Sequence, residues 1–124
     1  MSDNKIVLIV DDVPANIDIL KGMLSSEFKM KAAIKGEKAL SIAQRVPDLD
    51  LILLDVQMPE MDGYEVCRQL KANPQTARIP VIFVTGNDSQ EEVDKGMALG
   101  AVGYLIKPVS ADKLKDLIEK ILND

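Results

Sequence analysis

The chain has 124 residues, of which 47% are hydrophobic, so it is long and apolar enough to bury one core without disulfide bonds. Its 20 acidic residues outnumber its 15 Lys and Arg, and the net charge of -5 argues against direct binding of DNA or RNA. The sequence has no His, which excludes His-ligated metals, His general bases and Ser-His-Asp catalysis in this chain.

Five short apolar runs, several of them rich in β-branched residues, predict five strands. In chain order they cover residues 6–10, 30–34, 51–54, 81–84 and 102–106. Three of the runs have almost no polar residue, which is typical of strands in a parallel sheet that is covered on both faces. Parallel strands need crossover connections, so helices are expected between them.

Helical patterns lie between and after these runs. Pro14 suits the first turn of a helix, and Ser89 followed by Glu92 predicts a capping box at the start of another. The clearest apolar stripe at helical spacing consists of Leu114, Leu117, Ile118, Ile121 and Leu122. Strands alternating with helices of this size predict a three-layer α/β sandwich with a flavodoxin-like sheet.

A single cysteine cannot form an internal disulfide, and Cys67 is expected to be a buried apolar side chain in a helix. Met23 and Met97 are expected to fill the core, whereas Met58 and Met61 could contact a partner. The N-terminus lacks a secretory signal and no apolar run is long enough to span a bilayer, so a cytoplasmic location without membrane insertion is expected.

Polar residues follow four of the predicted strands. Asp11 and Asp12 follow the first, Asp55 the third, Thr85 the fourth and Lys107 the fifth. Because the carboxyl ends of parallel strands lie at one edge of the sheet, the five side chains are expected to converge there. Any single Asp in such a place can instead form a turn or cap a helix, but the conjunction favours a site.

The chemistry of these side chains suits a metal and a phosphoryl group. Carboxylates about 4 Å apart repel by about 4 kcal/mol per pair at a dielectric of about 20, which a bound cation would offset. Oxygen donors without His or thiolate favour Mg²⁺, with Mn²⁺ as a substitute. Lys107 and Thr85 could hold phosphoryl oxygens, and the Asp55 carboxylate could act as the nucleophile. Lys107 could instead be an ordinary surface cation, although Pro108 restricts it to extended geometry.

These residues lie in motifs that resemble the receiver domain of two-component response regulators. The resemblance is to the stand-alone type found among chemotaxis and cell-cycle regulators. It treats residues 1–124 as one receiver domain, with an ordered core over about residues 5–122 and no output domain. It implies the strand order 2-1-3-4-5. The motifs are Val10-Asp11-Asp12, Leu53-Leu54-Asp55-Val56-Gln57-Met58-Pro59 before Asp62-Gly63, Val84-Thr85-Gly86, and Gly103-Tyr104-Leu105-Ile106-Lys107-Pro108.

The resemblance also implies which residues bind the metal. Asp55 is then the phosphoacceptor, and it binds Mg²⁺ together with Asp11, Asp12 and the backbone carbonyl of Gln57. Gln57 and Asn87 flank the pocket and influence how fast water hydrolyses the acyl phosphate.

A second group of residues is implied to sense the phosphoryl group. Thr85 and Lys107 contact its oxygens, and the peptide bond between Lys107 and Pro108 is cis. Phosphorylation pulls Thr85 inward and lets the ring of Tyr104 move into the vacated space. Tyr104 could otherwise be a simple strand residue with its hydroxyl at the surface.

Partners follow from the same resemblance. The phosphodonor is a sensor histidine kinase or a histidine phosphotransfer protein, and it contacts Asn16, Ile17, Leu20 and Val109. A downstream target protein binds the face formed by the fourth helix, the fifth strand and the fifth helix. The chain is expected to be a monomer and no conventional enzyme, although it catalyses its own phosphorylation and dephosphorylation.

Three alternatives stay open. The chain could be a receiver excised from a longer regulator or hybrid kinase. It could be a small Mg²⁺-dependent phosphatase with an Asp nucleophile, like the haloacid-dehalogenase-like enzymes. Those enzymes need a second Asp two residues beyond the nucleophile, where this chain has Gln57. It could also be a scaffold that keeps the fold without the switch.

Overall fold

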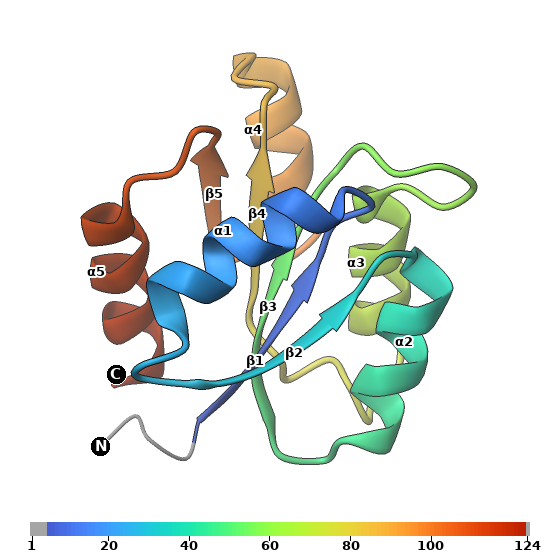
Figure 1. Ribbon diagram of the computed structural model, residues 1–124. Coiled ribbons are helices and arrows are strands. Elements are labelled where there is room, and N and C mark those ends of the chain that lie inside the picture. The colour runs from blue at the N-terminus through green and yellow to red at the C-terminus, as the bar shows by residue number, and fades with distance from the viewer. Residues whose placement is uncertain (1–4, 124) are drawn as a thin grey trace.

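The computed structural model describes residues 5–123, which form a five-stranded sheet with helices on both faces (Figure 1). The strand order is β2-β1-β3-β4-β5 and every neighbouring pair is parallel, which confirms the predicted fold class and the implied order. The elements are β1 (Ile6–Val10), α1 (Pro14–Leu24), β2 (Lys29–Ala33), α2 (Gly36–Arg45), β3 (Leu49–Leu54), α3 (Gly63–Ala72), β4 (Val81–Thr85), α4 (Gln90–Ala98), β5 (Gly103–Ile106) and α5 (Ala111–Leu122).

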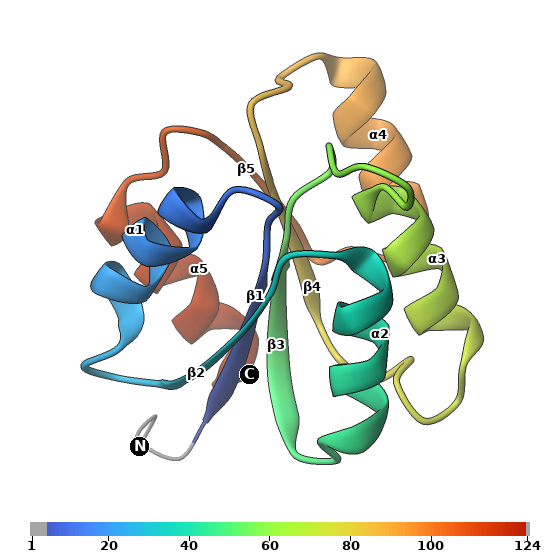
Figure 2. The same cartoon turned by 45° about the vertical axis from the view of Figure 1, so that its right-hand side comes forward.

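The sheet separates two apolar cores, because alternate residues of each strand face opposite sides. In β1, Val7 and Ile9 pack with α1 and α5, whereas Leu8 and Val10 pack with α2 and α3. Figure 2 accordingly shows α1 and α5 on one face of the sheet and α2, α3 and α4 on the other. The strands β1, β3 and β4 are covered on both faces, which explains why their sequences contain so few polar residues.

The predicted helix starts are present. Pro14 lies in the first turn of α1, and the hydroxyl of Ser89 accepts a hydrogen bond from the backbone N–H of Glu92 at 3.2 Å. The carboxylate of Asp62 caps α3 in the same way, accepting from the backbone N–H of Glu65 at 2.9 Å. These caps satisfy backbone donors that a helix start leaves free, so each helix begins directly after a loop at the carboxyl edge of the sheet.

Several details of the sequence prediction are wrong. Strand β2 ends at Ala33, and the next residue, Ile34, is 50% exposed. Met97 lies on α4 with 42% of its surface exposed rather than in the core, while Met58 is buried and offers no partner contact. An apolar residue type alone does not show which side of an element is covered, because much of a protein surface is apolar. Cys67 is buried as predicted.

Within residues 5–123, no helix has both the length and the apolar character needed to cross a bilayer.

Candidate functional site

The carboxyl edge of the sheet brings together residues that are far apart in the sequence. Asp11 and Asp55 directly follow β1 and β3, Thr85 ends β4, and Lys107 directly follows β5. Backbone hydrogen bonds continue the sheet into this edge: Asp55 N–H donates to the carbonyl of Val10 at 2.9 Å, and Lys107 N–H donates to that of Thr85 at 2.8 Å. The backbone positions of the side chains are therefore fixed by the rigid part of the fold.

Three carboxylates form the centre of this edge. Asp11, Asp12 and Asp55 each offer an oxygen atom, and these atoms lie within 4.8 Å of one another. Asp11 is only 2% exposed and Asp55 only 7%, so water screens their charges poorly. Asp12 is half-buried and leaves the cluster open to solvent on one side. A set of hard oxygen donors that surrounds excess negative charge fits a divalent cation such as Mg²⁺.

Lys107 partly offsets the negative charge. Its Nζ atom lies 2.8 Å from Oδ2 of Asp11 and 3.6 Å from Oδ1 of Asp55. The other oxygen of Asp11, Oδ1, accepts hydrogen bonds from the backbone N–H of Val13 at 2.9 Å and from the Asn16 amide at 3.4 Å. Both carboxylate oxygens of Asp11 therefore have partners within the protein. Lys107, however, places a single positive charge beside two buried carboxylates.

The charge of Asp55 is disfavoured where it stands. Burial raises the pKa of its carboxyl above the ordinary value, and the negative charge of Asp11 raises this pKa further. The ammonium of Lys107 and the backbone N–H groups of Val56 and Gln57 act in the opposite direction, but they do not outweigh the burial. Additional positive charge near Asp55 would therefore be stabilising.

Two more of the expected residues lie around this cluster. Gln57 is exposed at the start of the loop after Asp55. The side chain of Thr85 is buried, and its hydroxyl oxygen accepts a hydrogen bond from the backbone N–H of Asn87 at 3.4 Å. The Thr85 hydroxyl and the backbone of Asn87 therefore lie together at the carboxyl end of β4.

Tyr104 lies on β5 and is half-buried. Its ring packs against Phe83 with 5.9 Å between the centroids, and its hydroxyl donates to the carbonyl of Asn87 at 3.1 Å. The peptide bond between Lys107 and Pro108 is cis. The hydrogen bond to Asn87 places the Tyr104 hydroxyl against the loop between β4 and α4, where it is partly buried.

Sequence reasoning named Gly63 in a motif but assigned it no role at the site. A Cβ atom at this position would lie 2.1 Å from the carbonyl oxygen of Asp55, so a side chain has no room there. The backbone N–H of Gly63 also donates to the carbonyl of Val56 at 2.8 Å, which folds the loop back onto the end of β3. The glycine directly after Asp62 was a visible signal, but its close approach to Asp55 depends on the folded loop.

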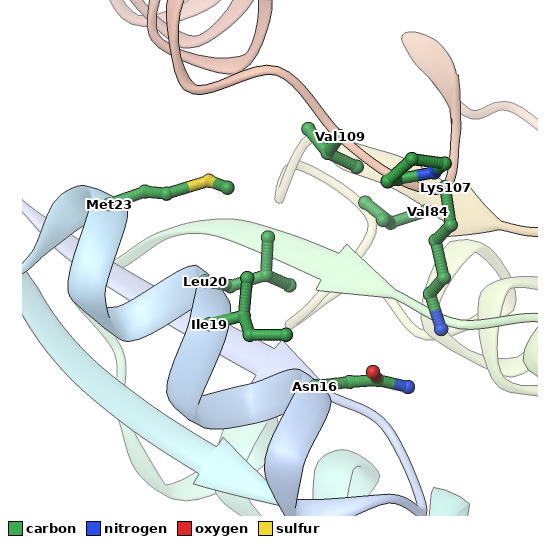
Figure 3. A pocket seen from close by; sticks show the side chains of 8 residues that line it. Asn16, Ile19, Leu20, Met23, Val84, Lys107 and Val109 are labelled. Carbon is green, nitrogen blue, oxygen red and sulfur yellow. The ribbon is translucent and has the colours of Figure 1, made fainter.

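An apolar cavity of about 370 Å³ lies beside Lys107, between α1 and the loop that joins β5 to α5 (Figure 3). Ile19, which is 57% exposed, contributes to it, whereas Ile17 is buried in the core beneath α1. The prediction that Ile17 contacts a partner is therefore wrong, because it lies on the inner face of the helix and does not line the cavity. Leu20 is equally buried, with 5% of its surface exposed, but it does line the cavity. The lining residues are Asn16, Ile19, Leu20, Met23, Val84, Lys107, Pro108 and Val109.

Comparisons with known proteins agree with this geometry. Residues 7–119 match the family model of the response regulator receiver domain. The chain is 48% identical over 118 residues to a probable cyclic di-GMP phosphodiesterase of Vibrio cholerae, and 44% identical over 105 residues to the response regulator PleD of Caulobacter vibrioides. These matches cover 95% and 83% of this chain but 26% and 23% of the relatives. The chain thus spans about a quarter of the length of these curated relatives.

A solved structure shares the whole fold. The receiver domain of a sensor histidine kinase from Pseudomonas aeruginosa, which is 28% identical, has a TM-score of 0.89 over 98% of this chain and 99% of that chain. That structure has a magnesium ion coordinated in its active-site cleft. Receiver domains are the phosphorylation-controlled switches of two-component signalling, and they take their phosphoryl groups from histidine kinases. The family match, which covers most of the chain, and the shared fold show that this chain belongs to the response regulator receiver domains.

Proposed function

We propose that this receiver domain takes a phosphoryl group from a phosphohistidine onto Asp55, in a reaction that depends on Mg²⁺. One observation carries the proposal: a buried carboxylate at the end of the central strand β3 lies within 4.8 Å of two further carboxylates and 3.6 Å from Lys107. A nucleophile, a metal-binding oxygen set and a cation for phosphoryl oxygens are thus available in one place.

Asp11, Asp12, Asp55 and the backbone carbonyl of Gln57 would hold the metal ion. Mg²⁺ suits these oxygen donors, and Mn²⁺ is expected to substitute for it. The relative from Pseudomonas aeruginosa with magnesium in its cleft supports this assignment. When bound, the ion supplies positive charge that lowers the mutual repulsion of the carboxylates and of the phosphoryl oxygens.

The residues of the chain have separate roles in phosphoryl transfer. An Asp55 carboxylate oxygen attacks phosphorus, the P–O bond forms as the P–N bond to the donor imidazole breaks, and that bond's electron pair leaves with the imidazole. The Lys107 ammonium and the Thr85 hydroxyl hold oxygens of the transferred group. In hydrolysis, water attacks the same phosphorus and releases the Asp55 carboxylate. Gln57 and Asn87 lie next to this path and set how readily water enters.

The cavity beside Lys107 is the proposed contact site of the phosphodonor. It is apolar, and the exposed Ile19 lies at its α1 side. It is also lined by Lys107, whose Nζ atom lies 3.6 Å from Asp55. A sensor kinase or phosphotransfer protein would place an apolar side chain in this cavity and its phosphohistidine over the carboxylates. Asn16 and Val109 line the cavity from α1 and from the loop after β5.

The output of the switch is proposed to be altered protein binding. Phosphorylation would draw the Thr85 hydroxyl towards the new oxygens, and the ring of Tyr104 would change position with it. Tyr104 lies at the edge of the face formed by α4, β5 and α5, which we assign to the downstream target protein. We further propose that the domain works as a monomer in the cytoplasm, away from nucleic acid and membranes.

Intact-mass measurement tests the acceptor. The protein is incubated with acetyl phosphate and Mg²⁺, and the same is done with Asp55→Asn and with Asp48→Asn, which changes an exposed carboxylate far from the site. We expect one phosphoryl adduct on the native chain and on Asp48→Asn, and none on Asp55→Asn or when EDTA removes the metal. Equal labelling of Asp55→Asn would refute the assignment, and release of many phosphates per chain would indicate a phosphatase instead.

A further inference from the structure

Tyr64 has a buried hydroxyl that connects three elements of the fold. It lies in the first turn of α3, is only 6% exposed, and packs edge-on against Phe83 with 5.2 Å between the ring centroids. Its hydroxyl lies 2.7 Å from a carboxylate oxygen of Glu92 and 3.0 Å from the Glu92 carbonyl. The hydroxyl of Tyr104 is 3.3 Å away. One oxygen atom of α3 therefore contacts α4 and β5 at once.

The hydroxyl groups of this cluster have defined donor and acceptor roles. A tyrosine hydroxyl can donate one hydrogen bond, and an ionised carboxylate is the strongest acceptor within reach of Tyr64. Tyr64 therefore donates to Glu92 and offers only lone pairs to Tyr104. The hydrogen of Tyr104 is shared between the Tyr64 oxygen and the carbonyl of Asn87, which is 3.1 Å away. Burial raises the pKa of the Tyr64 phenol, and the contacts of its hydroxyl with Tyr104 and with the Glu92 carboxylate raise this pKa further, so it stays a donor at neutral pH.

Helix α4 packs closely on the same rings. A Cβ atom at Gly96 would lie 3.0 Å from the ring of Phe83 and 3.2 Å from the ring of Tyr104. Lys95 places its Nζ atom 4.8 Å from the centre of the Tyr64 ring. Figure 2 shows α3 and α4 on the same face of the sheet. A movement of α4 along the sheet would therefore change both its packing on Tyr104 and its hydrogen bond with Tyr64.

We propose that Tyr64 is a positioning residue: its hydroxyl, anchored by Glu92, holds Tyr104 in place and ties the position of Tyr104 to that of α4. The proposal rests on the proposed function, because it gives the movement of Tyr104 a route to α4. Phosphorylation would shift the Tyr104 hydroxyl, Tyr64 would lose one partner, and the contact between Tyr64 and Glu92 would readjust. A Phe at this position would fill the same space against Phe83 and keep the ring beside Lys95, but it would make no hydrogen bond to Glu92 or Tyr104.

The chain is suited to a direct test, because it contains only two tyrosines. Labelling tyrosine with ¹³C at the ring carbon that carries the hydroxyl gives one NMR signal for each tyrosine. In Tyr64→Phe only the Tyr104 signal remains. In mixtures of H₂O and D₂O this signal reports the exchange rate of the Tyr104 hydroxyl. The variants to compare are Tyr64→Phe, Glu92→Ala, both together, and Glu91→Ala as an exposed control on the same turn of α4.

We expect hydroxyl exchange at Tyr104 to accelerate about twofold in Tyr64→Phe, at the lower end of the effect of losing one hydrogen bond, because the Asn87 carbonyl still accepts the hydrogen. Glu92→Ala should accelerate it less, because the Glu92 carbonyl, 3.0 Å from the Tyr64 hydroxyl, still accepts its hydrogen, and the double variant should not exceed Tyr64→Phe. Glu91→Ala should change nothing. Unchanged exchange in Tyr64→Phe, or fully additive effects of the two substitutions, would overturn the proposal.

A second arm separates this proposal from the proposed function. Beryllofluoride with Mg²⁺, which mimics a phosphoryl group on a carboxylate, is added to the native chain and to Tyr64→Phe. Backbone amide signals of α4 should shift in the native chain and shift at most half as far in Tyr64→Phe, while the Tyr104 signal responds in both. Equal α4 shifts in both proteins would refute the coupling. A native chain that does not respond at all would count against Asp55 as acceptor, and the exchange experiment would still test the hold of Tyr64 on Tyr104.

Discussion

Asp55→Asn is expected to stabilise the metal-free protein, because it removes one of three crowded carboxylate charges. The oxygens of Asp11, Asp12 and Asp55 lie within 4.8 Å of one another. Each neighbour therefore repels Asp55 by about 3.5 kcal/mol or more at a dielectric of about 20. Lys107, 3.6 Å from Asp55, returns about 4.6 kcal/mol of attraction on the same scale. Because solvent screens the half-buried Asp12, the expected net gain in the free energy of unfolding is about 1 to 2 kcal/mol.

Urea unfolding followed by circular dichroism measures this difference at neutral pH with EDTA present. Asp48→Asn is the matched control, and its free energy of unfolding should stay within about 0.5 kcal/mol of the native value. Mg²⁺ at ten times its Kd should stabilise the native chain by about 1.4 kcal/mol and Asp55→Asn by clearly less. If Asp55→Asn is less stable than the native chain in EDTA, or gains as much from Mg²⁺, the electrostatic account of the site is wrong.

The pH dependence provides a second check of the same reasoning. The folded-state pKa of Asp55 is raised, so in the interval above the ordinary carboxyl pKa the folded state binds more protons than the unfolded state. Stability contributed by Asp55 is then lost as the pH rises from about 4 through the raised value. The advantage of Asp55→Asn over the native chain in EDTA should therefore grow with pH across this interval. An advantage that shrinks with rising pH would contradict the raised pKa.

Two further substitutions test the supports of the site. Lys107→Met should lower the free energy of unfolding in EDTA by about 3 kcal/mol, because it leaves the buried Asp11 without its cation. Chemical denaturation measures this difference, and an unchanged free energy of unfolding would contradict the prediction. Gly63→Ala should cost about 2 kcal/mol and slow phosphorylation by acetyl phosphate, because its Cβ would collide with the Asp55 carbonyl. A Cβ atom at Gly22 would meet no other atom within 4 Å, so Gly22→Ala should instead stabilise α1 by about 0.5 to 1 kcal/mol. Equal effects of Gly63→Ala and Gly22→Ala on stability would count against the collision of the Gly63 Cβ with the Asp55 carbonyl.

The fold could be predicted from the sequence because local and global signals agree. The nearly pure apolar runs identify strands covered on both faces, and the capping residue Ser89 and the stripe through Leu114 and Ile118 locate helices. Because the strands are parallel, Asp11 and Asp55 must lie at the same edge of the sheet. This can be predicted without knowing the conformation of the loops. What the sequence could not resolve is which apolar residue at a helix surface finds a covering neighbour, so Met97 was placed in the core wrongly.

The site was predictable in its composition but not in its detail. The side chains at strand ends follow from topology, whereas contacts made by loops and helices depend on distances that no local pattern carries. Gly63 at the back of Asp55 and Asn16 beside Asp11 belong to this second kind. The same is true of Tyr64, whose partners are 28 and 40 residues away in the sequence. Such residues are visible as types in the sequence, but their roles follow only from the packing of one element on another.

Chemical mapping of the acceptor tests the central claim most directly. After incubation with acetyl phosphate and Mg²⁺, borohydride reduces an acyl phosphate to an alcohol, which converts an aspartyl phosphate into homoserine. Peptide mapping by mass spectrometry then locates the homoserine. Our account predicts homoserine at residue 55 and at no other Asp of the chain, and none when EDTA is present. Homoserine at Asp11 or Asp12, or labelling that does not depend on the metal, would contradict it.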